Sequence, residues 1–135
     1  MGRAVLILLD THVVAWVAFE PNRISKSARA AIDEARAAAK GRAVSDISLF
    51  ELARVAAKKR LDLAASPKSF LSEVEQRFVV IPITAEIGLR SLSLPRPYPR
   101  DPADRIIAAT AIVEGLRLIT ADRGIRNSRA LATVW

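Results

Sequence analysis

Cysteine is absent from this chain of 135 residues, and His12 is its only histidine. The lack of cysteine excludes disulfides, thiol nucleophiles and thiolate metal sites together, and it is compatible with a reducing cytoplasm. Long apolar runs are missing as well, since residues 4–9 and 13–19 fall far short of the ~20 residues of a membrane span. No phosphate-binding loop, dinucleotide-binding glycine motif or nucleophile-elbow serine occurs. For His12 we favour a local hydrogen-bonding role over that of a general base.

Acidic residues are the minority charge, with 14 Asp and Glu against 21 Lys and Arg and a formal net charge of +7. Most of the basic residues are arginines, whose planar guanidinium group matches the geometry of phosphate. The excess predicts a polyanionic partner or an acidic protein partner, although solvated, arginine-rich helix faces give the same composition. Because 51% of the residues are apolar and the length suits one core, we expect a single domain over residues 1–135.

Strands and helices are expected to alternate along the chain, which predicts an α/β fold with a parallel sheet covered on both faces. Residues 4–9 are apolar throughout, as in a central parallel strand. Ser25 and Gly41 are expected to cap the two ends of the second helix, and Gly115 to end the helix before the fourth strand. The expected strands are 4–9, 43–45, 78–83, 116–120 and 132–135. The expected helices are 11–19, 24–40, 48–60, 67–77, 84–92 and 102–114, with a turn or short helix at 122–127.

Four acidic residues follow a strand or open a helix in this pattern, namely Asp10, Glu51, Asp104 and Asp122. In a parallel sheet, the carboxyl ends of the strands and the helix N-termini meet at one edge, where ligands bind. Carboxylates gathered there repel one another by roughly a few kcal/mol per close pair, so protons or a hard cation must neutralise them. Oxygen ligands suit Mg²⁺ or Mn²⁺. The four acids therefore predict a metal-dependent hydrolytic centre.

Each acid also has a purely structural interpretation. Asp10 and Asp122 can cap the helix or turn that follows them, and Glu51 stands at capping-box distance from a preceding serine. Asp101 can cap the helix whose first turn contains Asp104, a position that the helix dipole favours. None of these interpretations explains why all four acids fall on one edge of one sheet. Capping and metal binding are also compatible, because a carboxylate at a helix start projects into the crevice.

The acids lie in four longer motifs: LLDTH at 8–12, VSDISLFELA at 44–53, RDPADRIIAATA at 100–111 and LITAD at 118–122. In these motifs, and in their order and spacing, the chain resembles PIN-domain ribonucleases, in particular VapC-type toxins of prokaryotic toxin–antitoxin pairs. The resemblance extends over essentially the whole chain. It implies a three-layer α/β/α sandwich with a central parallel sheet.

The resemblance also implies a function. It implies a cytoplasmic endoribonuclease that depends on Mg²⁺ or Mn²⁺, forms a homodimer and is blocked by a cognate antitoxin. In such an enzyme, water activated by the ion would attack an RNA phosphodiester bond in line. By motif, the catalytic and metal-binding residues are Asp10, Glu51, Asp104 and Asp122. The positions matched as supporting are Asp101, Thr11 and Thr120.

Other functions compete with this hypothesis. A phosphoacceptor receiver domain shares the sheet and the acidic pocket, but it needs a late lysine, and no lysine follows Lys68. A PIN-type nuclease for RNA processing or structure-specific cleavage would act without an antitoxin, and a small upstream gene distinguishes the two. A non-catalytic RNA-binding or protein-binding domain would show no metal-dependent chemistry.

A docking groove for the antitoxin is expected on the N-terminal helices. Its apolar side chains would be Val13, Val14, Trp16, Val17, Leu49 and Leu52. The alternative is that all six are ordinary core residues, which we accept for Leu52. The basic rim of the groove would be Arg54, Lys58, Lys59 and Arg60, which suits an amphipathic segment with acidic residues. Most of the aromatic side chains are expected in the core, from the set Trp16, Phe19, Phe50, Phe70 and Phe78.

Overall fold

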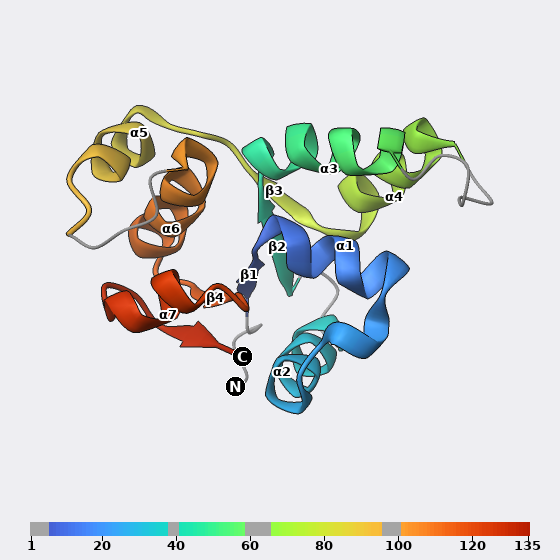
Figure 1. Ribbon diagram of the computed structural model, residues 1–135. Coiled ribbons are helices and arrows are strands. Elements are labelled where there is room, and N and C mark those ends of the chain that lie inside the picture. Colours follow the sequence, from blue (N-terminus) through green and yellow to red (C-terminus); the bar gives the residue numbers. More distant parts are fainter. Residues whose placement is uncertain (1–5, 38–40, 59–65, 96–100) are drawn as a thin grey trace.

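The computed structural model describes residues 6–37, 41–58, 66–95 and 101–135 (Figure 1). Five strands form one sheet in the order β3-β2-β1-β4-β5, and every neighbouring pair is parallel. The strands are β1 (Ile7–Leu9), β2 (Arg42–Ser45), β3 (Val79–Ile81), β4 (Arg117–Ile119) and β5 (Thr133–Val134). Because all five run in the same direction, their carboxyl ends lie at a single edge, as the sequence predicted.

Helices cover both faces of this sheet. They are α1 (Thr11–Phe19), α2 (Lys26–Arg36), α3 (Asp46–Lys58), α4 (Pro67–Arg77), α5 (Ala85–Leu92), α6 (Pro102–Glu114) and α7 (Arg123–Ser128), with a 3-10 helix η1 at Pro21–Arg23. In Figure 1, α1 to α4 lie on one side of β1 and β2, and α5 to α7 lie on the other. The predicted three-layer α/β/α sandwich is confirmed. None of the helices in the described part of the chain is long and apolar enough to cross a membrane.

The alternation of side chains along the strands divides the interior into two cores. In β1, Ile7 and Leu9 pack with residues of α1, α2, α3 and α4, whereas Leu8 packs with residues of α5, α6 and α7. All three strand residues are fully buried. Continuous apolar character along β1 is therefore a consequence of burial on both faces. On α6, the small residues Ala108, Ala109 and Ala111 are buried in the second core, which lets this helix approach the sheet closely.

Most element boundaries agree with the expected ones, and α1 and α4 match them fully. Ser25 caps α2 through its hydroxyl, and Gly115 ends α6 in the left-handed conformation, both as predicted. The prediction that Gly41 caps α2 is wrong, because the helix ends at Arg36 and its C-cap is Ala37. Gly41 is instead buried so tightly that a Cβ atom would collide with the carbonyl oxygen of Ala35.

Candidate active site

Asp10 lies between β1 and α1 and is the most buried acidic residue among those that the structure describes. Its Oδ1 accepts a hydrogen bond of 2.8 Å from the amide of Thr11, and its Oδ2 accepts one of 2.8 Å from the Thr120 hydroxyl. The His12 Nδ1 atom is 3.5 Å from the same Oδ2. Burial raises the pKa of Asp10, although His12 and these two hydrogen bonds oppose the change.

Glu51 is held by a contact that joins α3 to α1. The Thr11 hydroxyl lies 2.6 Å from Glu51 Oε1 and 2.8 Å from the hydroxyl of Ser48, which is fully buried. A hydroxyl has a single proton and an ionised carboxylate only accepts, so Thr11 donates to Glu51 and Ser48 donates to Thr11. The predicted capping box is wrong, because α3 begins at Asp46 and Ser48 already lies inside the helix.

Asp104 lies in the first turn of α6, half-buried, and its side chain makes no hydrogen bond to another described residue. Partial burial is the main reason why its pKa is raised to about 7, and the negative charges of Asp10, Asp101, Asp122 and Glu51 add to the effect. Asp101 is exposed and caps α6, accepting a hydrogen bond of 2.9 Å from the amide of Ala103, as predicted.

Asp122 caps α7, because its Oδ1 accepts a hydrogen bond of 3.0 Å from the amide of Ile125. Its own amide donates to the Thr120 hydroxyl at 3.1 Å, and that hydroxyl donates to Asp10. The charge of Asp122 also raises the pKa of both Asp10 and Asp104. Asp122 is therefore within electrostatic range of the other acids, although it does not line the pocket they share.

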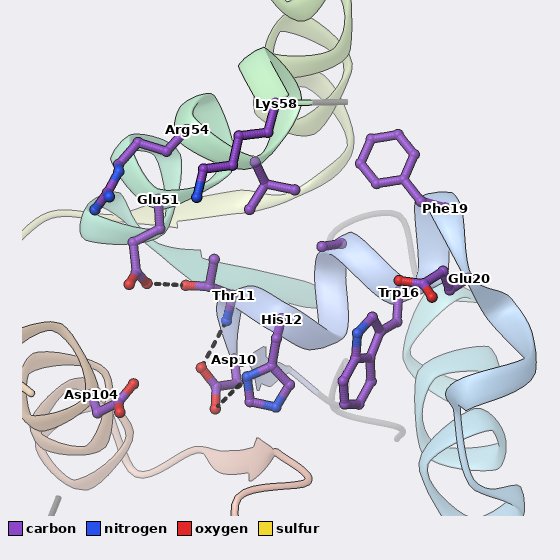
Figure 2. Close-up of a pocket in the computed structure, with 12 residues that line it drawn as sticks. Asp10, Thr11, His12, Trp16, Phe19, Glu20, Glu51, Arg54, Lys58 and Asp104 are labelled. Atoms are coloured by element: carbon purple, nitrogen blue, oxygen red, sulfur yellow. Dashed lines mark hydrogen bonds and ion pairs between the residues drawn. The ribbon is translucent and has the colours of Figure 1, made fainter. Parts of the chain in front are cut away.

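Asp10, Glu51 and Asp104 line one pocket of about 380 Å³ between α1, α3 and α6. Figure 2 shows the carboxyl groups of these three residues directed toward the same space from three different elements. Away from the acids, the pocket continues between α1 and α3 as a groove. Its remaining lining residues are Thr11, His12, Ala15, Trp16, Phe19, Glu20, Arg54, Val55 and Lys58. The pocket thus has an acidic end and an end that is aromatic on one wall and basic on the other.

The chemistry of the acidic end fits a hard divalent cation. Its donors are carboxylate oxygens, and burial, together with the charge of neighbouring acids, raises the pKa of Asp10 and of Asp104, so a cation bound there would favour their ionised forms. Within the described residues, no group of three or more Asp, Glu or His side chains already surrounds one point. Mg²⁺ does not require such a group, because it keeps several waters and is usually bound through one or two carboxylates.

The sequence was compared with protein-family models and known proteins. The PIN domain model matches residues 7–130. The chain belongs to the PIN-domain family. Over 131 residues it is 41% identical to a Mycobacterium tuberculosis protein named Ribonuclease VapC22. The aligned region covers 96% of this chain and 98% of that protein. The resemblance predicted from the four motifs is thereby confirmed.

Solved structures share the fold of this PIN domain. A toxin–antitoxin complex from Klebsiella pneumoniae contains a chain with a TM-score of 0.70 and 24% identity, covering 94% of this chain and 96% of that one. VapBC2 from Rickettsia felis, bound to a DNA fragment from its promoter, gives a TM-score of 0.72 at 18% identity, with 96% and 97% covered. At these identities the similarity concerns the fold.

Sequence reasoning did not assign Ser48, Arg54 and Lys58 to the pocket or to its hydrogen bonds. Ser48 was treated as a helix cap, and its contact with Thr11 spans 37 positions of the chain. Arg54 and Lys58 were assigned to the rim of a docking surface, whereas they line the same pocket as the acids. Helical spacing from Glu51 was the available signal, because residues three and seven positions further on share its face.

The predicted apolar docking groove is wrong for Val13 and Val14, which are at most 3% exposed and belong to the core, so they cannot contact a partner. Leu52 is fully buried, which confirms the core position expected for it. Trp16 lines the groove between α1 and α3, while Lys59 and Arg60 lie outside the described residues. Among the five aromatic residues considered for the core, Phe50 is not a core residue, because it is 61% exposed.

Proposed function

We propose that this PIN domain is a metal-dependent endoribonuclease, and that it acts as the toxin of a toxin–antitoxin pair in the cytoplasm. The observation that carries the proposal is the convergence of Asp10, Glu51 and Asp104 on one pocket, with Asp122 within electrostatic range. Similarity to a protein named as a VapC ribonuclease, over nearly the whole of both chains, supports the reaction and the substrate class.

Asp10, Glu51 and Asp104, which line the pocket, and Asp122 would hold Mg²⁺ or Mn²⁺. A bound divalent cation would activate water as a nucleophile and offset charge on the phosphoryl oxygens. The chain itself contributes orientation. Thr120 and the Thr11 amide fix the Asp10 carboxylate, and the Thr11 hydroxyl fixes Glu51, so the acids need little rearrangement when substrate enters.

The test of this function is cleavage of RNA by the purified protein with Mn²⁺ and after chelation. We expect cleavage with metal only, and none by Asp10→Asn. The matched control is Asp33→Asn, which changes an exposed acid of α2 outside the pocket. Cleavage by Asp10→Asn at the wild-type rate would refute the assignment of the site. Mapping of new RNA ends after brief expression would then identify the RNA that is cut.

An antitoxin partner is the second element of the proposal, and it is supported by the toxin–antitoxin complexes among the similar structures. Co-expression with a small neighbouring gene should give a stable complex in which cleavage is suppressed. A purified pair without inhibition would instead favour the alternative, a PIN nuclease that processes RNA and has no antitoxin.

Homodimer formation is supported by a group of exposed apolar side chains. Phe50 on α3, Ile83 before α5, and Leu89 and Leu92 on α5 are 61%, 40%, 69% and 78% exposed. The amide of Ile83 donates a 3.2 Å hydrogen bond to Asp46, which joins the segment after β3 to the start of α3. Exposed apolar groups of this kind are typical of interaction surfaces. Light scattering should show a dimer, and Leu92→Glu should give a monomer that still cleaves RNA.

A further inference from the structure

We infer that Arg54 and Lys58 of α3 form a subsite for the RNA backbone next to the scissile phosphodiester. The inference rests on the proposed function and adds the placement of the strand within the pocket. Glu51, Arg54 and Lys58 are spaced by three and four residues, so they lie on one face of α3. All three line the pocket, and Figure 2 shows the side chains of Arg54 and Lys58 near Glu51 on α3.

The two cations are available for a ligand. No ion pair among the described residues involves Arg54 or Lys58, although Arg54 lies only one helical turn beyond Glu51. The Arg54 guanidinium has one aromatic contact, 6.0 Å from the centre of the Phe50 ring, which leaves its hydrogen-bond donors unused. The other acid of the groove, Glu20, is partly compensated by Arg23 at 3.7 Å. The basic end of the pocket therefore has donors for an anion.

The dimensions of the groove suit a single strand. At a rise of about 1.5 Å per residue, the seven positions from Glu51 to Lys58 span roughly 10 Å along α3. That length is on the order of one or two nucleotides beyond a phosphate at the acidic end. The groove is closed on its other side by Ala15, Trp16 and Phe19 of α1. A nucleic acid strand placed there has its phosphates toward α3 and its bases toward the apolar wall.

An acidic protein segment is the competing occupant, and we favour RNA because of continuity. The cations share one helix face and one pocket with the proposed catalytic acids, so a strand cut at Asp10 and Asp104 must pass them. An acidic segment in the same place would bring further negative charge to carboxylates that already repel one another.

The experiment measures RNA binding as a function of salt, in an Asp104→Asn background that does not cleave. The probes are a fluorescein-labelled single-stranded RNA of about ten nucleotides, which is within known site sizes, and labelled polyglutamate. Each lost phosphate contact reduces the magnitude of the negative slope of log K against log salt concentration by about 0.7 for a single strand. We expect this reduction for Arg54→Gln and Lys58→Gln, and about twice as much for the double variant. The control, Lys26→Gln, removes an exposed lysine of α2 outside the pocket and should keep the slope.

In the cleaving protein, the same variants should raise KM and leave kcat nearly unchanged, as expected for uniform binding of substrate and transition state. Unchanged RNA slopes in both variants overturn the inference while the nuclease assignment stands. A loss of polyglutamate binding with unchanged RNA binding overturns it in favour of a protein partner. RNA binding by none of the proteins, wild type included, overturns the inference and the proposed function together.

Discussion

Replacing Asp104 by Asn should stabilise the metal-free protein at alkaline pH, although it removes a residue of the proposed active site. The pKa of Asp104 is raised from 3.8 to about 7 in the folded state, so folding opposes its ionisation. The direction of this stability change follows from linkage. Below pH 3.8 the carboxyl group is protonated in both states, so its raised folded pKa does not lower the free energy of unfolding. Its cost grows as the pH rises between 3.8 and about 7, and is complete above that. Asparagine cannot ionise and avoids this cost.

The magnitude is limited by exposure. A shift of three pKa units corresponds to about 4 kcal/mol, at 1.36 kcal/mol per unit. Asp104 is only half-buried, and solvent screens exposed charges strongly, so we reduce the expected gain to about 1–2 kcal/mol. The substitution sacrifices no hydrogen bond that the structure gives this side chain. For a domain of this length, a gain of this size corresponds to a rise in Tm of roughly 3–8 °C.

The assay is urea unfolding of both proteins in chelator, at about pH 8 and at about pH 4.5. We expect the gain at the higher pH, little at the lower pH, and a decrease in high salt. Asp33→Asn on α2 serves as control and should show no such dependence. With saturating Mn²⁺ the order should reverse, because a bound cation stabilises the native carboxylates. A variant that is less stable at pH 8, or equally stabilised at both pH values, would refute the electrostatic reasoning.

Three further outcomes are expected. Thr11→Val should lower kcat by about tenfold, because it removes a charge-assisted hydrogen bond to Glu51 of roughly 1.5–3 kcal/mol. Thr11→Ser keeps the hydroxyl and should restore kcat. Equal activity of the two variants would contradict this role of the hydroxyl. Mn²⁺ at about 100 times its Kd should add about 2.7 kcal/mol to the free energy of unfolding, and an unchanged melting curve would argue against a metal site. Gly41→Ala should cost about 1–3 kcal/mol in urea unfolding, because the new Cβ meets the Ala35 carbonyl; wild-type stability would show that this contact relaxes freely.

The elements that sequence reasoning placed correctly are those specified by local chemistry. Asp101 and Gly115 end α6 at the expected positions, because a cap needs only a side chain or a backbone conformation beside the helix. The parallel strand β1 was recognisable because burial on both faces removes polar residues from it. Convergence of the acids on one sheet edge also followed, since strand direction alone determines where these residues lie.

What the sequence could not provide are contacts between distant parts of the chain. The structural alternative for Glu51 was a capping box in its own helix, whereas its carboxylate accepts a hydrogen bond from Thr11, 40 positions away. A capping box and a contact between helices use the same residue types, so spacing alone does not distinguish them. The functions of Arg54 and Lys58 depend in the same way on which neighbour α3 faces, and a single helical pattern does not contain that information.

The acidic residues of the site differ in whether their contribution to folding stability explains an acid at that position. Asp10 and Asp122 are N-caps, and such caps are typically worth about 1 kcal/mol, which is a sufficient structural reason for each. Asp104 is not a cap, and the helix dipole contributes only about 0.3–1 kcal/mol at its first-turn position. That contribution does not offset the 1–2 kcal/mol expected for ionising Asp104 beside the other acids. Stability therefore favours a neutral residue at this position, which is why we assign the Asp104 carboxylate to the proposed metal site.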